Sequence, residues 1–476
     1  MRRYTQWMLT LMLMTFAARL GAYTIPYETW MGVYVGESKI GYMSYRVDKA
    51  EYDGIQGYKI DSVINNRLAI LGVDLTQLIT TIVYTDSDSK PLKEELIMSS
   101  GGKTTKISAV FKKDTIECVI SAGSGSSQKS VPMPKGINLI GDPMFAIEDP
   151  SIRVGSEYSL HYFNPLTLMV DPITAKAERE EKITLGKKQY DTFVIKSVSP
   201  MGEMTVWQEK NGNVVQVKGI MGMSMKQQTK EEAMAGVGVG PSEDLAVFTS
   251  IKPNRVIKTP RTVKKLDIIL QGFTNPVLKD SRQSTTSCKS PDGTRFIITA
   301  ADFDSGKSIT LPIEDAAYQE YLSSTPYIDH DQSTVTKQTK EIVGEEKNAY
   351  LACSKIRNWV NTNMKTRADI GITRSGSDVL KSKVGVCRDY AILFASLARS
   401  AGVPTRIAAG LLYLDGSFYY HAWNECYVGE WVPFDSTLTT DFVDATHIKL
   451  AEGDATSMFG LSKVMGSLKA DIKSFE

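Results

Sequence analysis

Apolar and polar residues alternate along much of the first half of the chain, as they do in half-buried strands. The segment "GVYVGESKIGYMSYRVDKA" alternates on both sides of a glycine-containing turn, as a β-hairpin does. Asn211-Gly212, between two further alternating runs, predicts another hairpin. The pattern predicts a β-rich N-terminal domain over residues 23–234, with one or two antiparallel sheets. "PMPKGINLIGDPMFAI" interrupts the strands and leaves that number open.

A change of composition follows at residues 235–244, "AGVGVGPSED". The spaced glycines are similar to those of a phosphate-binding loop. The strand-turn-helix setting and a following Lys-Ser/Thr are both missing, so we interpret the segment as a linker. A smaller β region is predicted over residues 245–333, where "KKLDIILQGF" and "TRFIITAADF" carry strand patterns.

Helical periodicity begins after Thr334. One face of "KQTKEIVGEEKNAYLACSKIRNWVNTNM" gathers Ile342, Val343, Tyr350, Leu351, Ile356, Trp359 and Val360. A strongly apolar helix is predicted from Cys387, ended by Gly402 and Pro404. Strand patterns then follow in "TRIAAGLLYL", "SFYYHAWNECYV" and "WVPFDSTL". Residues 334–476 are therefore predicted to form an α+β domain, with helices preceding an antiparallel sheet.

The first residues show a different pattern. Arg2 and Arg3 precede an apolar stretch from about Trp7 to Ala18, which is shorter than the ~20 apolar residues that span a bilayer. Small residues at positions 21 and 22 offer a cleavage point. We predict a signal peptide over residues 1–22 and a secreted or periplasmic protein with no integral membrane segment after cleavage. An uncleaved anchor is the alternative.

Charge and cysteine content exclude some partners. The 55 Lys and Arg residues balance 54 Asp and Glu residues, and no long basic run occurs. Nucleic-acid binding usually depends on clustered positive charge, so we expect no nucleic-acid partner. The five cysteines are widely spaced and contain no CxxC pair, which argues against structural zinc. We expect no metal site and no cofactor.

Three residues with catalytic chemistry follow one another in the C-terminal part: Cys387, His421 and Asp435. Cys387 begins a predicted helix, His421 lies in a predicted strand, and Asp435 ends the next strand. The turn at Gly429-Glu430 makes the two strands antiparallel neighbours. Cross-strand pairing would then bring His421 and Asp435 within hydrogen-bonding distance.

These residue types are the ones that nucleophilic catalysis by a thiol requires. A thiolate is the nucleophile, and a helix N-terminus or a neighbouring imidazolium lowers the pKa of the Cys387 thiol. His421 would protonate the leaving amine, and Asp435 would fix the tautomer and orientation of the ring. Backbone N–H groups at the helix start could bind the oxyanion. Gly385, which lacks a side chain, would let substrate approach the backbone beside the thiol.

Each residue alone also has a structural interpretation. Cys387 could be a small buried apolar group, His421 a packed histidine and Asp435 a turn or cap residue. Their joint arrangement favours the catalytic interpretation. His330 lies between two aspartates in "IDHDQ", and we interpret it as a solvated loop residue rather than a metal ligand. His447 is interpreted as structural.

The C-terminal part resembles the transglutaminase-like (transglutaminase/protease) superfamily, in its exported bacterial branch. The resemblance is carried by "GVCRDYAILFASLARSAGVPTRIAAGLLY", "FYYHAWNECYVGEWVPFDST" and "DATHIKLAEGD". It implies a papain-like fold and a triad of Cys387, His421 and Asp435. It also implies attack on amide bonds through a thioester acyl-enzyme.

Trp423 and Glu425 share a face with His421 by strand alternation. The resemblance implies that Trp423 is a wall of the site and that Glu425 is a structural or substrate-lining carboxylate. The alternatives are sheet packing for Trp423 and a solvated charge for Glu425.

The leading hypothesis is a secreted cysteine enzyme that acts on a protein, peptide or cell-wall peptide. Water as the acyl acceptor gives a peptidase or amidase, whereas an amine gives a protein-glutamine transamidase; exclusion of water decides between them. We favour hydrolysis for an exported protein. A non-catalytic envelope binding or assembly protein, in which the N-terminal β region acts, is the alternative of a different class.

Overall fold

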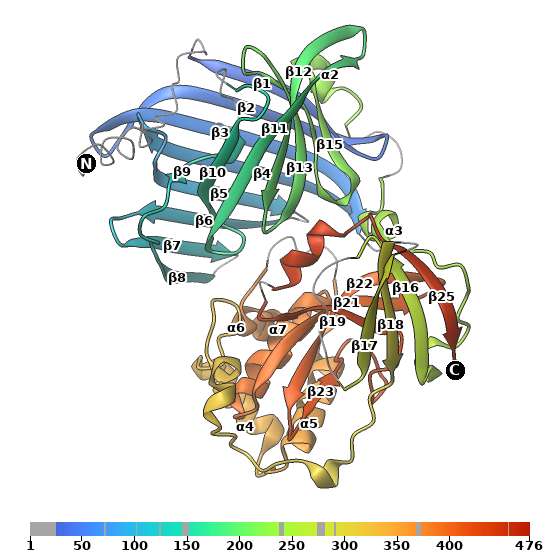
Figure 1. The fold of residues 1–476 in the computed structure, drawn as a ribbon. Helices are drawn as coiled ribbons and strands as arrows, with labels where there is room; N and C mark the ends of the chain where they lie inside the picture. Colours follow the sequence, from blue (N-terminus) through green and yellow to red (C-terminus); the bar gives the residue numbers. More distant parts are fainter. Residues whose placement is uncertain are drawn as a thin grey trace, which may run out of the picture.

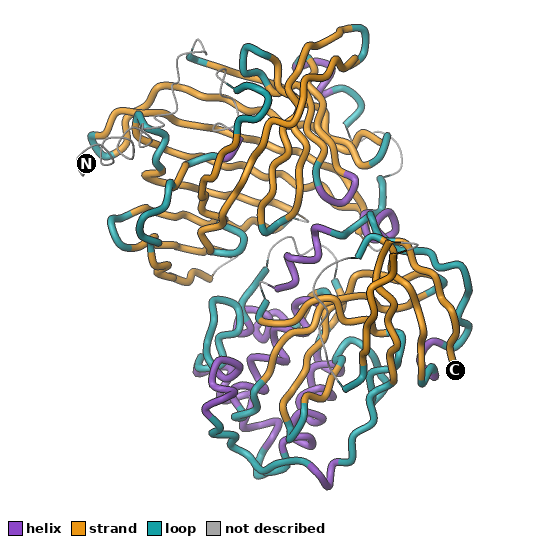
Figure 2. Tube along the Cα trace, viewed as in Figure 1, coloured by secondary structure: helices purple, strands orange, loops and turns teal. Residues whose placement is uncertain are grey.

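The computed structural model describes residues 25–70, 73–100, 102–122, 125–144, 152–237, 242–273, 281–289, 292–367, 373–455 and 457–476. The predicted signal peptide lies outside these ranges. The N-terminal part forms a large β-sheet, and the C-terminal part combines helices with smaller sheets (Figures 1 and 2). None of the helices in the described ranges is long and apolar enough to cross a membrane.

One sheet of 15 strands makes up the N-terminal part. Its strand order is β8-β7-β6-β5-β4-β3-β2-β1-β15-β14-β13-β12-β11-β10-β9, and only the β9–β10 pair at one edge is parallel. The strands are β1 (Tyr27–Val35), β2 (Ser38–Tyr52), β3 (Ile55–Ile70), β4 (Val73–Asp86), β5 (Pro91–Ser100), β6 (Lys103–Phe111), β7 (Thr115–Ala122), β8 (Gly125–Pro132), β9 (Leu139–Ile140), β10 (Glu157–Asn164), β11 (Met169–Leu185), β12 (Lys188–Ser199), β13 (Gly202–Glu209), β14 (Val214–Lys218) and β15 (Met223–Gln228).

The hairpins lie where the sequence pattern predicts them. Val35 pairs with Ser38 across the first turn, in which Gly36 has a φ of 57°. The turn at Asn211-Gly212 joins β13 to β14, and Gly212 has a φ of 98°. Positive φ values favour glycine. The segment that interrupts the strand pattern contains β9 and lies between β8 and β10. The segment connects β8, at one edge of the sheet, to β9, at the other edge. All 15 strands remain in one continuous sheet, so the segment does not divide them into two sheets.

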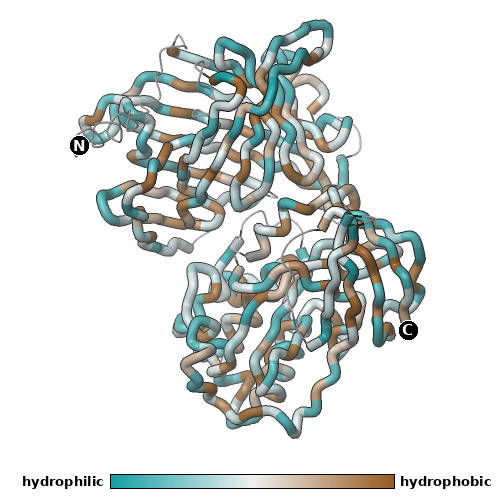
Figure 3. The backbone as a smooth tube through the Cα atoms, viewed as in Figure 1, coloured by the Kyte–Doolittle hydropathy of each residue, from teal (hydrophilic) through white to brown (hydrophobic). Residues whose placement is uncertain are grey.

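The core of the large sheet lies between its two halves. Strands β1–β4 pass behind β11–β13, and hydrophobic and hydrophilic residues alternate along the strands (Figures 1 and 3). The buried core residues include Met31, Val33, Tyr45, Val47, Ile60, Ala177, Phe193, Ile195, Val206 and Val214. One sheet thus buries its apolar face by folding over on itself.

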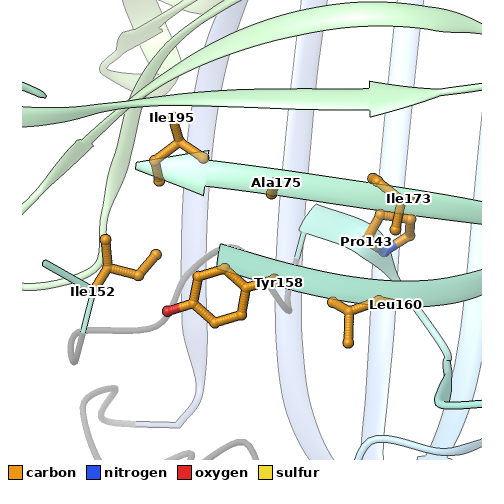
Figure 4. A pocket seen from close by; sticks show the side chains of 7 residues that line it. All are labelled: Pro143, Ile152, Tyr158, Leu160, Ile173, Ala175 and Ile195. Atoms are coloured by element: carbon orange, nitrogen blue, oxygen red, sulfur yellow. The ribbon is translucent and has the colours of Figure 1, made fainter. Parts of the chain in front are cut away.

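A small apolar cavity of about 10 Å³ lies within this part of the fold (Figure 4). It is lined by Pro143, Ile152, Tyr158, Leu160, Ile173, Ala175 and Ile195. Such a volume holds about one water molecule. The cavity is therefore too small to be a substrate site.

The C-terminal part is built on a four-stranded sheet of order β23-β22-β21-β24. Its strands are β21 (Thr405–Leu414), β22 (Ser417–Tyr427), β23 (Trp431–Phe434) and β24 (His447–Gly453). Helices pack on one face, and a second four-stranded sheet packs on the other. Strand β21 lies between these layers and is buried along almost its whole length.

The second sheet has the order β17-β18-β16-β25. Its strands are β16 (Lys265–Gln271), β17 (Gln283–Lys289), β18 (Asp292–Thr299) and the C-terminal β25 (Lys469–Phe475). Apolar residues of this sheet share a core with β21 and β24. The predicted β region at 245–333 therefore packs as one body with the sheet of the predicted domain at 334–476, and the last strand of the chain completes its sheet.

The helices are α2 (Lys230–Met234), α3 (Leu245–Thr249), α4 (Ser333–Val343), α5 (Ala349–Asn363), α6 (Gly376–Ser382) and α7 (Cys387–Ser400). Gly344, with a φ of 59°, ends α4, so the periodic segment after Thr334 forms two helices. Asn348 then caps α5 by accepting the N–H of Leu351. Short strands β19 (Lys365–Thr366) and β20 (Val384–Gly385) form a parallel pair just before α7.

The large sheet contacts the C-terminal part near α7. Tyr327 packs against residues of α7 and donates its hydroxyl hydrogen bond to the backbone oxygen of Leu166, beyond β10. Ser462, in the short helix η5 (Ser457–Lys463), donates to the backbone oxygen of Met201. The helix that begins at Cys387 therefore lies close to the junction of the two parts.

Candidate active site

Cys387 is the first residue of α7, a helix of 14 residues that is buried apart from its first two residues and its last. Asp389 fixes the start of the helix, because its carboxylate accepts the N–H of Val386 at 2.9 Å. Nη2 of Arg374 lies 3.0 Å from the same carboxylate. These contacts hold the thiol at the positive end of the helix dipole, which favours a thiolate.

Gly385 lies against the side chain that caps α7. A Cβ at this position would be 2.4 Å from Cβ of Asp389 and 2.8 Å from its Oδ2. From the sequence, this glycine was expected to leave room for substrate. The structure instead gives the missing side chain a packing reason, because Asp389 occupies the space. Gly385 is itself buried.

Replacing Gly385 by alanine should destabilise the fold by about 1–3 kcal/mol, the usual cost of overpacking. The added methyl group would push Asp389 from the start of α7. Urea unfolding measures the loss of stability. Gly219→Ala is the matched control, because a Cβ there has no neighbour closer than 3.9 Å. Equal stability of the two variants would contradict the prediction.

His421 lies on β22, and Asp435 follows the last residue of β23. The register pairs Asn424 with Phe434, so the chain at Asp435 runs beside the strand that carries the histidine. Nε2 of His421 is 2.8 Å from Oδ2 of Asp435. The structure thus brings together the two residues that the turn at Gly429-Glu430 was expected to pair.

The thiol of Cys387 interacts with His421, and this interaction lowers the pKa of the thiol. Because Nε2 of His421 faces Asp435, Nδ1 is the nitrogen left for the sulfur. Burial would raise the pKa of Cys387, but His421, the N–H of Ala422 and the charge of Arg388 outweigh it and lower that pKa. Burial would lower the pKa of His421, but Asp435 and Cys387 outweigh it and raise that pKa to about 10. Both shifts favour a thiolate–imidazolium pair.

Asp435 is buried, and both of its carboxylate oxygens accept hydrogen bonds. Oδ1 accepts from the backbone N–H of Thr437 at 2.8 Å and from its hydroxyl at 2.6 Å. Oδ2 is 2.8 Å from His421 and 3.1 Å from Nε2 of His447. Burial would raise the pKa of Asp435, but the two histidines hold it well below its usual range. Thr437 was not expected in the site from the sequence, and His447 was interpreted only as a structural residue.

Trp423 lies beside the catalytic candidates but is only 1% exposed. Its ring is stacked on that of His421 with centroids 6.1 Å apart, and it meets the ring of His447 in a T-shaped contact with centroids 5.4 Å apart. The side chain therefore packs the two imidazoles from within. This position matches the packing alternative better than a wall exposed to substrate.

Glu425 is 3% exposed and belongs to a buried ion network. Its carboxylate is 2.9 Å from Nε of Arg406 and 2.9 Å from Nζ of Lys449. Glu452 pairs with the same two cations, at 2.7 and 2.8 Å. These contacts occupy the carboxylate of Glu425, so the structure places it in a structural role rather than against a substrate.

Glu425→Gln should lower the free energy of unfolding by about 3–5 kcal/mol, the cost of removing one partner of a buried ion pair. Lys449 is 2% exposed and would be left with a deficit of negative charge. Urea unfolding measures the effect. Glu203→Gln is the control, since its pair with Lys196 is exposed, and it should behave as wild type. A wild-type midpoint for Glu425→Gln would contradict the assignment.

All five cysteines lie in the described ranges and carry free thiols. Burial raises the pKa of Cys118 to about 12 and raises that of Cys353 well above its ordinary value. The lowered pKa of Cys387 sets it apart from these two. His330 is hydrogen-bonded to Ser324 in an exposed loop, which agrees with its interpretation as a loop residue.

His421, Asp435 and His447 form the group of potential metal ligands in the described part of the chain, with ligand atoms within 4.8 Å of one another. In this structure, Nε2 of His421 and Nε2 of His447 are both hydrogen-bonded to Oδ2 of Asp435. Binding of a cation would require both Nε2 atoms to lose their protons and both hydrogen bonds to break. The donor set therefore fits a hydrogen-bonded site better than a metal site.

Two comparisons concern the sequence. The family model of the transglutaminase-like superfamily matches residues 336–436. An uncharacterized protein of Haemophilus influenzae is 32% identical over 111 residues, which cover 21% of this chain and 29% of that protein. The match thus spans less than a third of that relative's length.

Solved structures give a weaker likeness. A Cytophaga hutchinsonii protein, provisionally described as a cysteine protease, is 19% identical with a TM-score of 0.31; the match covers 45% of this chain and 89% of that one. A Parabacteroides distasonis protein, provisionally described as a protease, is 10% identical with a TM-score of 0.23, covering 87% and 68%. The family match includes Cys387 and His421 and ends just after Asp435. By this match, the chain carries a domain of the transglutaminase-like superfamily.

Proposed function

We propose that the C-terminal domain is a cysteine-dependent peptidase or amidase with Cys387, His421 and Asp435 as catalytic residues. One observation carries the proposal: Nε2 of His421 is 2.8 Å from Asp435, and the interaction of His421 with Cys387 lowers the pKa of the thiol. The three groups meet in a domain of a superfamily that includes amide-bond chemistry. A thiolate is the nucleophilic form of cysteine.

In the first step, Sγ of Cys387 attacks the carbonyl carbon of the substrate amide, and the carbonyl oxygen takes up the electron pair. The backbone N–H groups of Cys387 and Arg388, at the first two positions of α7, are candidate donors to that oxyanion. His421 gives its Nδ1 proton to the amine, the C–N bond breaks, and a thioester remains on Cys387.

In the second step, water attacks the thioester carbon and His421 accepts one of its protons. The C–S bond breaks, the acid product leaves, and the thiolate is restored. Asp435 stays ionised throughout, holding the ring and balancing its positive charge. An amine in place of water would give transamidation from the same thioester. We propose a protein, peptide or cell-wall peptide as substrate, and secretion directed by residues 1–22.

The test is incubation of the purified protein with peptide and cell-wall peptide libraries, with and without a primary amine, followed by mass spectrometry. Hydrolysis predicts new free carboxyl ends in both samples. Incorporation of the amine in place of water would identify a transamidase. Tight binding without any reaction, retained in Cys387→Ala, would instead support an envelope binding protein and overturn the proposal.

A further inference from the structure

His447 approaches the site from a strand that does not carry any of the three catalytic candidates. It begins β24, which is separated from β22 by β21. Its side chain is fully buried, and its ring lies 6.0 Å from that of His421. Gly410 of β21 pairs with His421 on one side and Lys449 on the other, and a Cβ there would lie 1.9 Å from the backbone oxygen of Ile448. The glycine permits the close approach of β21 and β24.

Both ring nitrogens of His447 face oxygen acceptors. Nε2 is 3.1 Å from Oδ2 of Asp435. Nδ1 is 3.3 Å from the backbone oxygen of Asp444 and 3.5 Å from its Oδ1. A neutral imidazole has one N–H and can serve only one side, whereas the doubly protonated ring donates to both. The ring of His447 therefore lies between two carboxylates, those of Asp435 and Asp444.

Asp444 is held in the same way as Asp435. Oδ1 of Asp444 accepts from the backbone N–H of Thr446 at 2.8 Å and from its hydroxyl at 2.6 Å. Oδ2 lies 2.7 Å from Nη1 of Arg261, and Arg282 donates to the backbone oxygen of Asp444 at 3.1 Å. The local pattern is Asp-x-Thr in both places. Each threonine fixes one carboxylate oxygen and leaves the other to face a cation.

We propose that His447 is a positioning residue of the active site, which holds the Asp435 carboxylate toward His421 and is itself held by Asp444 and Arg261. The inference rests on the proposed catalytic role of Cys387, His421 and Asp435. The groups form a continuous series of contacts from the thiol to Arg261. Arg261 precedes the second sheet in the chain, so the small β region contributes to the site.

The positioning role has a defined physical cause. With Thr437 on one oxygen and two imidazoles on the other, the carboxylate of Asp435 has little freedom to rotate. Removing His447 frees Oδ2 on one side and weakens its hold on His421. A weaker interaction between Asp435 and His421 lowers the pKa of His421 and raises that of Cys387. The thiolate–imidazolium pair then exists over a smaller range of pH, with a higher lower limit and a lower upper limit.

The opposite electrostatic effect must also be considered. The charged groups that face His447 in the described ranges are Asp435, Asp444 and, ring to ring, His421. Loss of a cation near His421 would by itself raise the pKa of His421. The direction of the shift therefore distinguishes positioning from simple charge repulsion.

The experiment compares wild type with His447→Gln, which keeps a donor but cannot carry the charge. Two readouts are taken on the full chain: the pH dependence of Cys387 alkylation by iodoacetamide, and kcat and KM on a peptide that wild type cleaves. We expect kcat to fall about 10- to 100-fold with KM little changed, as for a misplaced catalytic group. The alkylation midpoint should rise, and the alkaline limb of kcat should move to lower pH.

His330→Gln is the matched control, and it should leave both profiles unchanged. If His447→Gln does not fold, Arg261→Gln provides the test, because Arg261 is the partly exposed end of the series. It should shift the alkylation midpoint and the alkaline limb of kcat in the same directions as His447→Gln, but by a smaller amount. Unchanged limbs in a folded variant, or an alkaline limb that moves to higher pH, would overturn the inference. If Cys387 of the wild type were alkylated only at the pH values at which an ordinary cysteine reacts, the proposed function would be overturned instead.

Discussion

Cys387→Ala should abolish amide-bond cleavage, with a loss in kcat of more than about 10⁴-fold, the scale seen when a nucleophile of this kind is removed. Alanine suits the start of a helix, and the capping contact between Asp389 and Val386 does not involve the sulfur. The variant should therefore stay folded while losing the covalent step. Mass spectrometry after incubation with substrate measures this directly, because the variant cannot form the thioester.

The role of Cys387 as nucleophile also predicts how alkylation and turnover of the wild type change with pH. The pKa of Cys387 is below its ordinary value of 9.0, so alkylation should begin at lower pH than for a free thiol. The pKa of His421 is about 10, and above it the imidazolium that protonates the leaving amine is lost. Turnover should thus rise through the pKa of Cys387 and fall near pH 10. Alkylation should stay on its plateau there, because the thiolate persists.

Cys288→Ala is the matched control for the nucleophile. Cys288 is a partly exposed thiol on β17, in the second sheet. Its removal should change neither turnover nor the low-pH alkylation. If Cys387→Ala turned over substrate as fast as the wild type, Cys387 would be excluded as the nucleophile. Loss of low-pH alkylation in Cys288→Ala would show that the reactive thiol had been assigned to the wrong residue.

Local sequence patterns predict those parts of the site that depend on local structure. The start of α7 at Cys387 follows from an apolar period that ends in glycine and proline. The proximity of His421 and Asp435 follows from a tight turn between adjacent strands. In each case the deciding contacts lie within a few residues or across one hairpin.

The position of His447 beside Asp435 depends on the order of the strands in the sheet. The local pattern of apolar and polar residues does not determine that order. β24 pairs with β21 on the side away from β22, and only that order brings His447 to Asp435. The signal that could have pointed to it is the repeated Asp-x-Thr at Asp435 and Asp444. Similarly, the burial of Glu425 depends on Lys449, a partner on a third strand. The alternation of residues along β22 indicates which face of the strand Glu425 lies on. It does not indicate that a cation from another strand will pair with its carboxylate.

Asp435→Asn should have the second largest effect, because no orientation of an amide can replace this carboxylate. The carboxylate of Asp435 acts only as an acceptor in its four hydrogen bonds, two with Thr437 and two with the histidines. An asparagine NH₂ group in the Oδ1 position would meet the backbone N–H and hydroxyl of Thr437. In the Oδ2 position it would meet both imidazoles and would favour the wrong tautomer of His421.

The expected loss in kcat for Asp435→Asn is about 10²- to 10⁴-fold, the range known for removal of the orienting carboxylate from a triad. Without the carboxylate the pKa of His421 should fall and that of Cys387 should rise, so alkylation should shift to higher pH. Asp441→Asn is the control, because that carboxylate is 90% exposed in the loop after Asp435. If Asp435→Asn kept both wild-type turnover and the wild-type alkylation profile, Asp435 would not hold the imidazolium, and the thiolate would have to be stabilised by Ala422, Arg388 and the start of α7 alone.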